Sequence, residues 1–257
     1  FRRVLFRSYP EGRVSPTQEA QLTMFNGEPG NVRAYAVDGN FDDCQRLVKS
    51  AFADPALAAR LTSANSINVG RLLPQMVYYA HAVAELRRRG VESPAIFSTP
   101  SGNFGNLTAG LMTRRAGLPI GPFVAATNAN DIVPVYLSTG RFEPRPSVAT
   151  VANAMDVGNP SNFDRLMWLY GGSLDRMRAE VAGSRHDDDE VRRAIRQVAD
   201  ERGYVLDPHS AIAYLGLKAR LTGPGPRPAA AVFLATAHPA KFAEIVEPAL
   251  EIGRAHV

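Results

Sequence analysis

FSTPSGNFGNLTAG, residues 97–110, passes from a β-rich run through a loop of serine, glycine and asparagine into a helical pattern. A strand that leads directly into a helix predicts one βα unit of a parallel sheet. Gly102 and Gly105 let backbone N–H groups converge where the helix begins, and the helix dipole favours an anion at that end. Two interpretations are open here: a phosphate cradle, or a tight strand-to-helix turn with an asparagine cap. The glycine spacing does not fit the dinucleotide fingerprint G-x-G-x-x-G, and no lysine completes a P-loop.

The rest of the chain alternates strand-like and helix-like patterns. Apolar, β-rich runs predict strands at residues 31–37, 95–99, 123–127 and 229–235. Apolar residues at helical spacing predict helices at residues 41–53, 71–89, 105–116, 131–137, 163–170, 188–201 and 208–221, with a last helix near Ala240. This alternation predicts an α/β fold with a largely parallel sheet.

The composition is that of an ordinary globular chain. Of its 257 residues, 45% are hydrophobic and 21% are charged, which fits one large or two small domains. No apolar run reaches the roughly 18 residues that a membrane-spanning helix needs, and residues 1–12 lack the apolar stretch of a secretory signal. The single cysteine, Cys44, excludes an internal disulfide, and no acidic or histidine pair has metal-ligand spacing. We therefore expect a cytoplasmic protein without a metal site.

The charge balance is basic, with 29 Lys and Arg against 25 Asp and Glu and a formal net charge of +4. Such a balance is compatible with a nucleic acid or an acidic substrate. However, Arg2, Arg3 and Arg7 supply three of the four excess charges, and the other basic residues are mostly scattered. The sequence therefore predicts neither a nucleic-acid nor a membrane partner. The positive character that matters is local, at the helix start after Ser101 and at Arg71.

SANSINVGR, residues 63–71, places four polar residues at the entrance of an apolar helix, namely Asn65, Ser66, Asn68 and Arg71. If the helix begins at Ser66, Asn68 and Arg71 lie on one face. An arginine beside amide donors suits a small phosphorylated or carboxylated substrate. The alternative is a helix cap followed by a surface arginine.

ATAHPAKF, residues 235–242, follows the apolar run at 229–235. In α/β folds the carboxyl ends of parallel strands are where ligands bind, so Thr236 and His238 are candidates for such a site. His238 fits either an acid–base role or a helix cap. His209, in the segment DPHSA, is interpreted as a residue at the start of a helix.

Eight segments, in this order along the chain, resemble the threonine synthase family, which are pyridoxal-phosphate enzymes of fold type II. They are YPEGRVSPTQEAQL (9–22), AVDGNFDDCQRLVKSAF (36–52), NSINVGRLLPQ (65–75), PSGNFGNLTAG (100–110), ATNANDIVP (126–134), NAMDVGNPSNFDR (153–165), DPHSAIAY (207–214) and TAHPAKF (236–242). Eight colinear segments are far more specific than any one of them. The resemblance implies a three-layer fold around a parallel sheet.

The resemblance also implies roles for the candidate residues. The cofactor phosphate would be held by the loop Ser101, Gly102, Asn103, Phe104, Gly105 and Asn106. Thr236 would offer its hydroxyl to the pyridine nitrogen, and this neutral partner leaves that nitrogen largely unprotonated. Residues 65–71, with Arg71 on a phosphate or carboxylate, would bind O-phosphohomoserine, which the family converts with water to threonine and phosphate as a carbon–oxygen lyase.

One part of the family pattern is absent. A pyridoxal-phosphate enzyme binds its cofactor through a Schiff-base lysine, which in this family lies in an F-K-D context well upstream of the segment that starts here at Tyr9. Lys49, Lys218 and Lys241 do not match that context, and a second upstream Ser/Gly loop is also missing. We therefore expect a C-terminal fragment that is inactive alone and whose catalytic lysine is not in this chain.

The resemblance predicts how the chain is divided. Residues 9–62 are expected to be the remainder of a small α/β domain, and residues 63–250 most of a large cofactor-binding domain. Residues 1–8 and 251–257 fall outside the resemblance. Codons for these two ends can be chosen that are reverse complements of each other, as in a sequencing adaptor, so we predict that both ends are adaptor-derived. The nucleotide sequence tests this prediction.

Two other functions are open at this point. One is a related pyridoxal-phosphate lyase of different specificity, such as a threonine synthase-like paralogue. The other is a non-catalytic protein that binds a phosphorylated metabolite. The resemblance says nothing about the oligomeric state.

Overall fold

A four-stranded, fully parallel sheet forms the centre of the computed structural model, which describes residues 5–27, 30–63, 68–223 and 227–251. Its strand order is β5 (Val181–Arg185), β4 (Ile120–Thr127), β3 (Ala95–Pro100) and β6 (Ala231–Phe233). Every residue of β3 is buried, and so is β4 except for Pro122. Strands that are buried on both faces are typical of parallel sheets covered by helices on each side.

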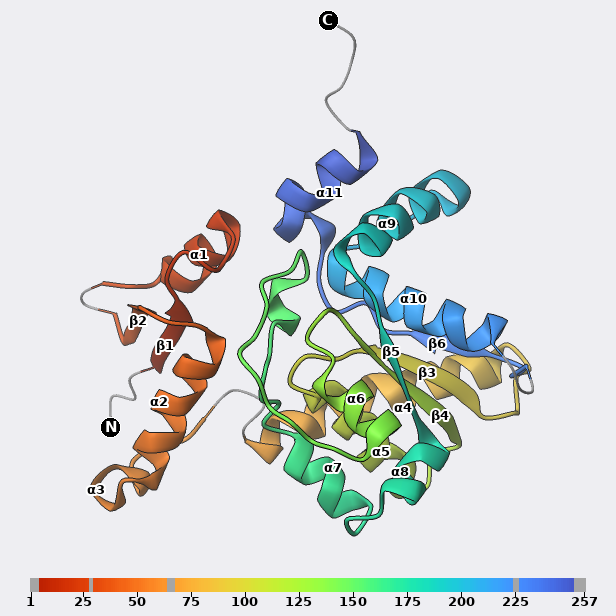
Figure 1. The fold of residues 1–257 in the computed structure, drawn as a ribbon, viewed down its shortest axis with the longest axis horizontal. Helices are drawn as coiled ribbons and strands as arrows, with labels where there is room; N and C mark the ends of the chain where they lie inside the picture. Colours follow the sequence, from red (N-terminus) through yellow and green to blue (C-terminus); the bar gives the residue numbers. More distant parts are fainter. Residues whose placement is uncertain (1–4, 28–29, 64–67, 224–226, 252–257) are drawn as a thin grey trace, which may run out of the picture.

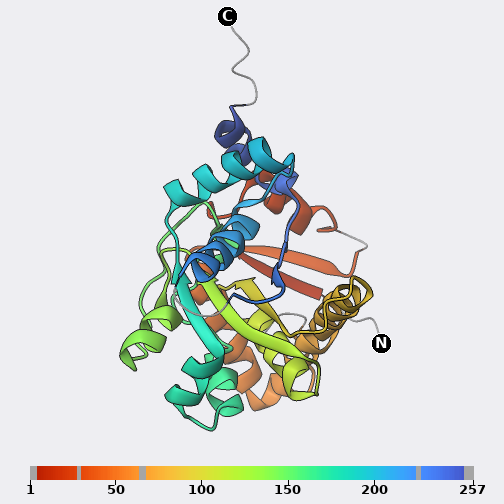
Figure 2. The same ribbon diagram turned by 90° about the vertical axis from the view of Figure 1, so that its right-hand side faces the viewer.

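Helices cover both faces of this sheet, which makes three layers (Figures 1 and 2). α4 (Leu72–Arg88) and α5 (Gly105–Arg115) lie on one face, and α9 (Asp188–Arg202) and α10 (Pro208–Thr222) lie on the other. The side-chain alternation of the strands explains this. Phe97 and Phe123 pack in the cluster that includes residues of α4 and α5, whereas Ile96 and Val124 pack against Leu217 of α10.

The N-terminal segment forms a separate small unit, drawn in red and orange in Figure 1. Its two strands, β1 (Leu5–Pro10) and β2 (Val32–Val37), pair in parallel with Leu5 opposite Val32. Three helices accompany them: α1 (Pro16–Thr23), α2 (Phe41–Ala53) and α3 (Pro55–Ala58). Reciprocal capping boxes begin α1 and α2, the first between Ser15 and Gln18.

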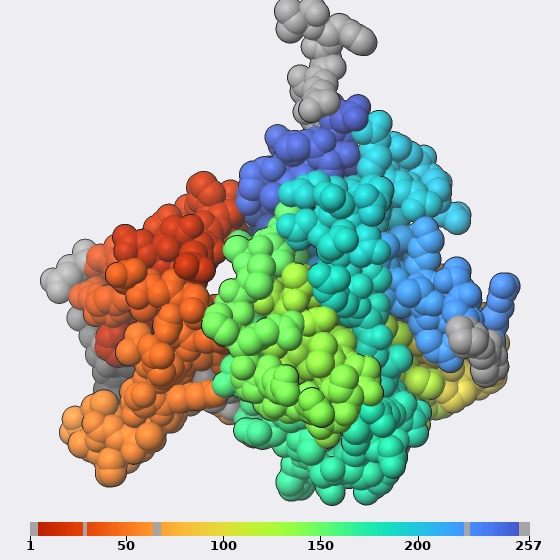
Figure 3. Space-filling view, in the orientation of Figure 1, coloured from red at the N-terminus to blue at the C-terminus, as the bar shows by residue number. Residues whose placement is uncertain are grey.

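The connection between α6 (Ile132–Thr139) and α7 (Phe163–Leu169) lies between the small unit and the large sheet (Figure 1). In the space-filling view this part of the chain, in green, lies beside the orange surface of the small unit (Figure 3). Gly158 in this connection donates its backbone N–H to Asp42 Oδ2 of α2 at 3.2 Å. The remaining elements are η1 (Val69–Arg71), η2 (Asn153–Met155), α8 (Leu174–Glu180), η3 (Pro239–Phe242) and α11 (Ala243–Leu250). None of the helices within the described ranges is both long and apolar enough to cross a membrane.

The structure confirms the predicted α/β fold with a parallel sheet. It shortens the strand expected at 229–235 to three paired residues, and it contains β1, α1, α8 and β5, which the sequence patterns do not indicate. β5 reads VAGSR and is an edge strand with one buried residue, so it lacks the alternation that marks a strand. The domain bounds at residues 62 and 63 and the adaptor origin of both chain ends stay predictions. Within the N-terminal end, Leu5–Ser8 belong to β1 and pair with β2.

Replacing Phe97 by alanine should destabilise the large unit strongly. The ring is fully buried, 5.3 Å from the ring of Tyr79 and 6.2 Å from that of Phe123 between centroids. Removing such a ring leaves a cavity that the neighbours fill only in part, so the free energy of unfolding should fall by about 3–5 kcal/mol in urea denaturation. Trp168→Ala is the matched control, because Trp168 is 81% exposed and its loss should change stability by about 0.5 kcal/mol or less. Equal effects of the two substitutions would contradict the assigned core.

Candidate functional site

Two predicted ligand loops meet at the carboxyl edge of the sheet. β3 and β6 are parallel neighbours with Ser98 opposite Phe233, and the N–H of Leu234 donates to the carbonyl of Ser98 at 3.0 Å. Ser101 and Thr236 each lie three residues beyond that pair, so the two segments leave neighbouring strands at the same edge of the sheet. The structure thereby brings together the loop after β3 and the segment after β6.

The loop after β3 presents an uncapped helix start. α5 begins at Gly105, and its N-cap residue, Phe104, adopts the left-handed conformation with φ of 59° and supplies no side-chain hydrogen bond. A helix whose first turn lacks a side-chain cap has N–H groups available for an anion. Ser101 anchors the loop, because its N–H donates to the Ala126 carbonyl at 2.8 Å and its hydroxyl donates to the Thr99 carbonyl at 3.0 Å.

The two asparagines of the loop have different partners. Asn103 Oδ1 accepts hydrogen bonds from the N–H of Ser161 at 2.6 Å and its hydroxyl at 2.9 Å, which ties the loop to the segment before α7. Asn106 Oδ1 accepts from the hydroxyls of Tyr78 at 2.5 Å and Tyr79 at 2.8 Å. Burial raises the pKa of both tyrosines, so they stay neutral donors. The amide nitrogen of Asn106 is therefore left as a donor for a ligand.

Gly102 is required by a close backbone approach from η2. A Cβ at this position would lie 2.6 Å from the Cα of Met155 and 3.2 Å from the carbonyl oxygen of Ala154. Since both contacts are with backbone, no side-chain rotation could relieve them. The path of the loop and the position of η2 therefore depend on each other.

Thr236 opens onto a pocket of about 350 Å³ between the small unit and the sheet edge. Its side chain is exposed, and no hydrogen bond from its hydroxyl to another described residue is present. Thr236 and nine other residues from both units line the pocket: Val14, Gln18, Gln21, Leu22, Ala154, His209, Ala237, Lys241 and Phe242. The hydroxyl of Thr236 is thus available to a ligand in this pocket.

The segment predicted to hold the substrate is only partly described. Asn65 and Ser66 lie outside the described residues. The expectation that Asn68 lies on the face of a helix beginning at Ser66 is wrong. Asn68 is the N-cap of η1, and its Oδ1 accepts from the N–H of Gly70 at 2.9 Å. Arg71 is exposed about two helical turns before Tyr78, and hence on the side of α4 that contacts Asn106. Of the two described candidates, Arg71 is free to bind a ligand and Asn68 is a cap.

His238 also turns out to be a cap. Its Nδ1 accepts from the N–H of Ala240 at 3.2 Å at the start of η3, and its side chain is exposed. His209, by contrast, is buried and lines the pocket. The sequence motif DPHSA indicates only a helix start, so the position of His209 in the pocket wall could not be predicted from the sequence.

A buried polar cluster beside the site was also not predicted. Asp156 Oδ1 accepts from the Thr150 hydroxyl at 2.7 Å and from Asn128 Nδ2 at 2.8 Å, while Oδ2 accepts from the N–H of Thr150 at 2.9 Å. Burial raises the pKa of the Asp156 carboxyl from 3.8 to about 6, although these hydrogen bonds favour the ionised form. The cluster fixes the chain that enters η2. Among the residues that the structure describes, no group of His, Cys, Asp or Glu is arranged to hold a metal ion.

The three lysines lie on three different elements, α2, α10 and η3. Lys49 is exposed on α2, and Lys218 Nζ donates to Gln197 Oε1 at 3.1 Å on the outer face of α10. Lys241 lines the pocket with Thr236. Lys49 and Lys218 are therefore not among the residues that line this pocket.

Comparison with known proteins decides the family. Residues 6–237 match the model of the family described as "Pyridoxal-phosphate dependent enzyme". The chain belongs to this family. A threonine synthase from Serratia marcescens is 45% identical over 244 residues, which are 94% of this chain and 54% of that protein. The chain thus spans about half the length of the curated relatives that it matches.

Solved structures agree with the family assignment. The crystal structure of threonine synthase from Escherichia coli superposes with a TM-score of 0.86 at 42% identity, over 96% of this chain and 56% of that one. A threonine synthase from Brucella melitensis, solved with pyridoxal phosphate bound, gives a TM-score of 0.78 at 37% identity, over 97% and 57%. These relatives establish the fold type II architecture of the pyridoxal-phosphate dependent enzyme described here.

The raised pKa of Asp156 makes the stability of this enzyme chain depend on pH. Between about pH 4 and pH 6 the folded chain holds a proton on Asp156 that the unfolded chain has released, so the contribution of this residue to the free energy of unfolding should fall by about 2 kcal/mol as the pH rises. Asp156→Asn cannot titrate. The difference in unfolding free energy between the wild type and this variant, measured in urea from pH 4 to pH 7, should shrink by that amount. A difference that does not change with pH would show that the carboxyl titrates normally.

Proposed function

We propose that this chain is the cofactor-binding part of a threonine synthase, which converts O-phosphohomoserine and water to threonine and phosphate. The observation that carries the proposal is the adjacency of the Ser101–Asn106 loop and Thr236 at the ends of two paired strands, in a chain 45% identical to threonine synthases. The activity of the whole protein, its substrate and the roles of the site residues are all parts of this proposal.

The loop has the chemistry needed to hold the phosphate of pyridoxal phosphate. It offers the uncapped start of an eleven-residue helix, the free amide of Asn106, and a glycine where a side chain could not fit. A dianionic phosphate is stabilised by such N–H groups and by the helix dipole. Ser101 and Asn103 would fix the shape of the loop, since the Ser101 hydroxyl is bound to β3 and the Asn103 side chain to Ser161.

Thr236 would orient the other end of the cofactor. Its exposed hydroxyl is a neutral partner for the pyridine nitrogen, which does not stabilise a proton there as a carboxylate would. Pyridoxal phosphate, when bound, supplies an electron sink for carbanions next to the amino acid nitrogen. The residues of this chain would set the position of the cofactor and the polarity at its nitrogen.

Arg71 would bind the phosphate or carboxylate of the substrate. The guanidinium is exposed on the α4 side nearest Asn106, and its planar donors suit an oxyanion. Asn65, Ser66 and Asn68 would contribute from the preceding segment, with Asn68 acting mainly by capping η1. We further propose that the chain alone is inactive, because none of its lysines matches the expected Schiff-base context.

Pyridoxamine phosphate tests the cofactor site without a lysine, because its amine cannot form an imine with the protein. The wild-type chain should bind it in calorimetry, and Thr236→Val should weaken binding about fivefold to tenfold through the loss of one hydrogen bond. Inorganic phosphate should bind the wild type and Thr236→Val equally. Gly102→Ala should weaken the binding of both pyridoxamine phosphate and inorganic phosphate, because its Cβ would collide with the backbone of Met155.

Thr222→Val is the control for the cofactor site, because the Thr222 hydroxyl bonds within α10 to the Lys218 carbonyl. If Thr236→Val binds pyridoxamine phosphate as well as the wild type, the cofactor role of Thr236 is wrong. Retained phosphate binding in that case would favour the non-catalytic phosphometabolite-binding alternative.

The reaction is tested by joining the chain to the portion of the Escherichia coli threonine synthase that it does not match. The chimaera should release threonine and phosphate from O-phosphohomoserine and show a visible absorbance band that borohydride abolishes. Arg71→Ala should raise KM for O-phosphohomoserine about tenfold or more, because a charge-assisted contact is lost. Arg60→Ala, at another exposed arginine, should leave KM unchanged. A chimaera with the band but no threonine would favour a related lyase instead.

A further inference from the structure

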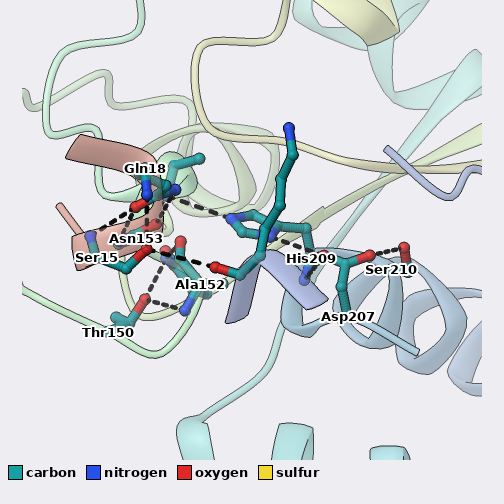
Figure 4. Close-up of polar contacts among 11 residues, drawn as sticks. Ser15, Gln18, Thr150, Ala152, Asn153, Asp207, His209 and Ser210 are labelled. Carbon is teal, nitrogen blue, oxygen red and sulfur yellow. Dashed lines mark hydrogen bonds and ion pairs between the residues drawn. The ribbon is translucent and has the colours of Figure 1, made fainter. Parts of the chain in front are cut away.

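Asp207 and His209 form a buried pair at the start of α10. Asp207 Oδ1 accepts hydrogen bonds from the backbone N–H and from Nδ1 of His209, each at 2.9 Å, and Oδ2 accepts from the hydroxyl of Ser210 (Figure 4). Burial opposes ionisation of the Asp207 carboxyl, but the bonds from His209 and Ser210 outweigh it and lower its pKa. A carboxylate held in this way fixes both the orientation and the tautomer of the imidazole.

The other nitrogen of His209 points to η2. With Nδ1 donating to Asp207, Nε2 is an acceptor, and the N–H of Ala154 donates to it at 3.3 Å. The imidazole is almost fully buried and lies against the ring of Phe242, with 4.7 Å between centroids. The ring therefore has one orientation in which both nitrogens are satisfied.

η2 is the segment whose backbone contacts Gly102 of the phosphate loop. Its Met155 Cα and Ala154 carbonyl occupy the space that a Cβ on Gly102 would need. Its first residue, Asn153, also exchanges two hydrogen bonds with Gln18 of α1, at 3.0 and 3.3 Å (Figure 4). The hydrogen bond from Ala154 to His209 is thus the link between α10 and the wall of the loop.

We propose that His209 is a positioning residue, which through the N–H of Ala154 holds η2 against Gly102 and so sets the shape of the phosphate loop. Its effect on a phosphorylated ligand rests on the proposed function, whereas its effect on η2 does not. In the described part of the chain, the imidazole makes hydrogen bonds to Ala154 and Asp207 and none to residues 101–106. Asp207 contributes to this positioning, because by accepting the proton of His209 Nδ1 in a hydrogen bond it leaves Nε2 of His209 as an acceptor.

Two substitutions of His209 separate positioning from simple packing. In His209→Gln the side-chain oxygen reaches the place of Nε2 and can accept from Ala154. In His209→Asn the amide can still donate to Asp207, but the side chain is too short to reach Ala154. Both variants lose the ring contact with Phe242, so a role in packing alone predicts the same effect for both.

The first measurement is amide hydrogen exchange in the full chain. Exchange at residues 153–155 and 101–103 should be faster in His209→Asn than in the wild type by about fivefold or more, and His209→Gln should restore most of the protection. Thr222→Val, at the other end of α10, is the control, because the Thr222 hydroxyl bonds to the carbonyls of Lys218 and Ala219 in the same helix. Equal exchange in the two His209 variants would overturn the proposal.

The second measurement is affinity for pyridoxamine phosphate, which should fall about fivefold in His209→Asn and less in His209→Gln. If the wild type does not bind this ligand but the exchange difference is present, the proposed function fails and the positioning of η2 stands. If His209→Asn does not fold, nitrogen NMR of the wild-type imidazole decides, since Nε2 must be the unprotonated nitrogen. A proton on Nε2 would overturn the proposal.

Discussion

Parallel pairing of β3 with both β4 and β6 is the constraint on which the site depends. Because all three strands run in one direction, their carboxyl ends share one edge, and segments more than a hundred residues apart in sequence meet there. Phe97 and Ile96 lock β3 to the helices on opposite faces. The apolar packing that fixes the strand thus also fixes the start of the loop at Ser101.

The proposed phosphate loop, Ser101–Asn106, gains its shape from backbone rather than from charged side chains. The loop contains no lysine or arginine, and the groups that we propose to bind an anion are N–H groups at the start of α5. Backbone donors need an exact path of the chain, which explains why the loop is tied at Ser101 to β3, at Asn103 to Ser161 and at Gly102 to η2. The net charge of the chain is therefore irrelevant to this site, and local geometry is what counts.

Sequence reasoning recovered what periodicity and motifs encode. The β3–loop–α5 unit, the parallel sheet and the place of Thr236 all follow from apolar runs and the residues next to them. The partners of buried polar groups could not be found in this way. Asp156 with Asn128 and His209 with Ala154 lie 28 and 55 residues apart, and no local pattern specifies such pairs. β5 was not predicted for a different reason: an edge strand with one buried residue shows no alternation of apolar and polar residues.

The small unit is held to the large one by a different kind of interaction than the one that stabilises each core. Gln18 with Asn153, Ser15 with the Lys241 carbonyl, and Asp42 with Gly158 are polar contacts, some of them at 3.2 Å or longer. Each such bond adds only about 1 kcal/mol net, far less than the burial of an aromatic ring such as Phe97. Because the pocket beside Thr236 is lined from both units, its width depends on these weak contacts. The proposed cofactor site is therefore built on the parallel sheet, and the wall opposite it is held by contacts that each contribute little free energy.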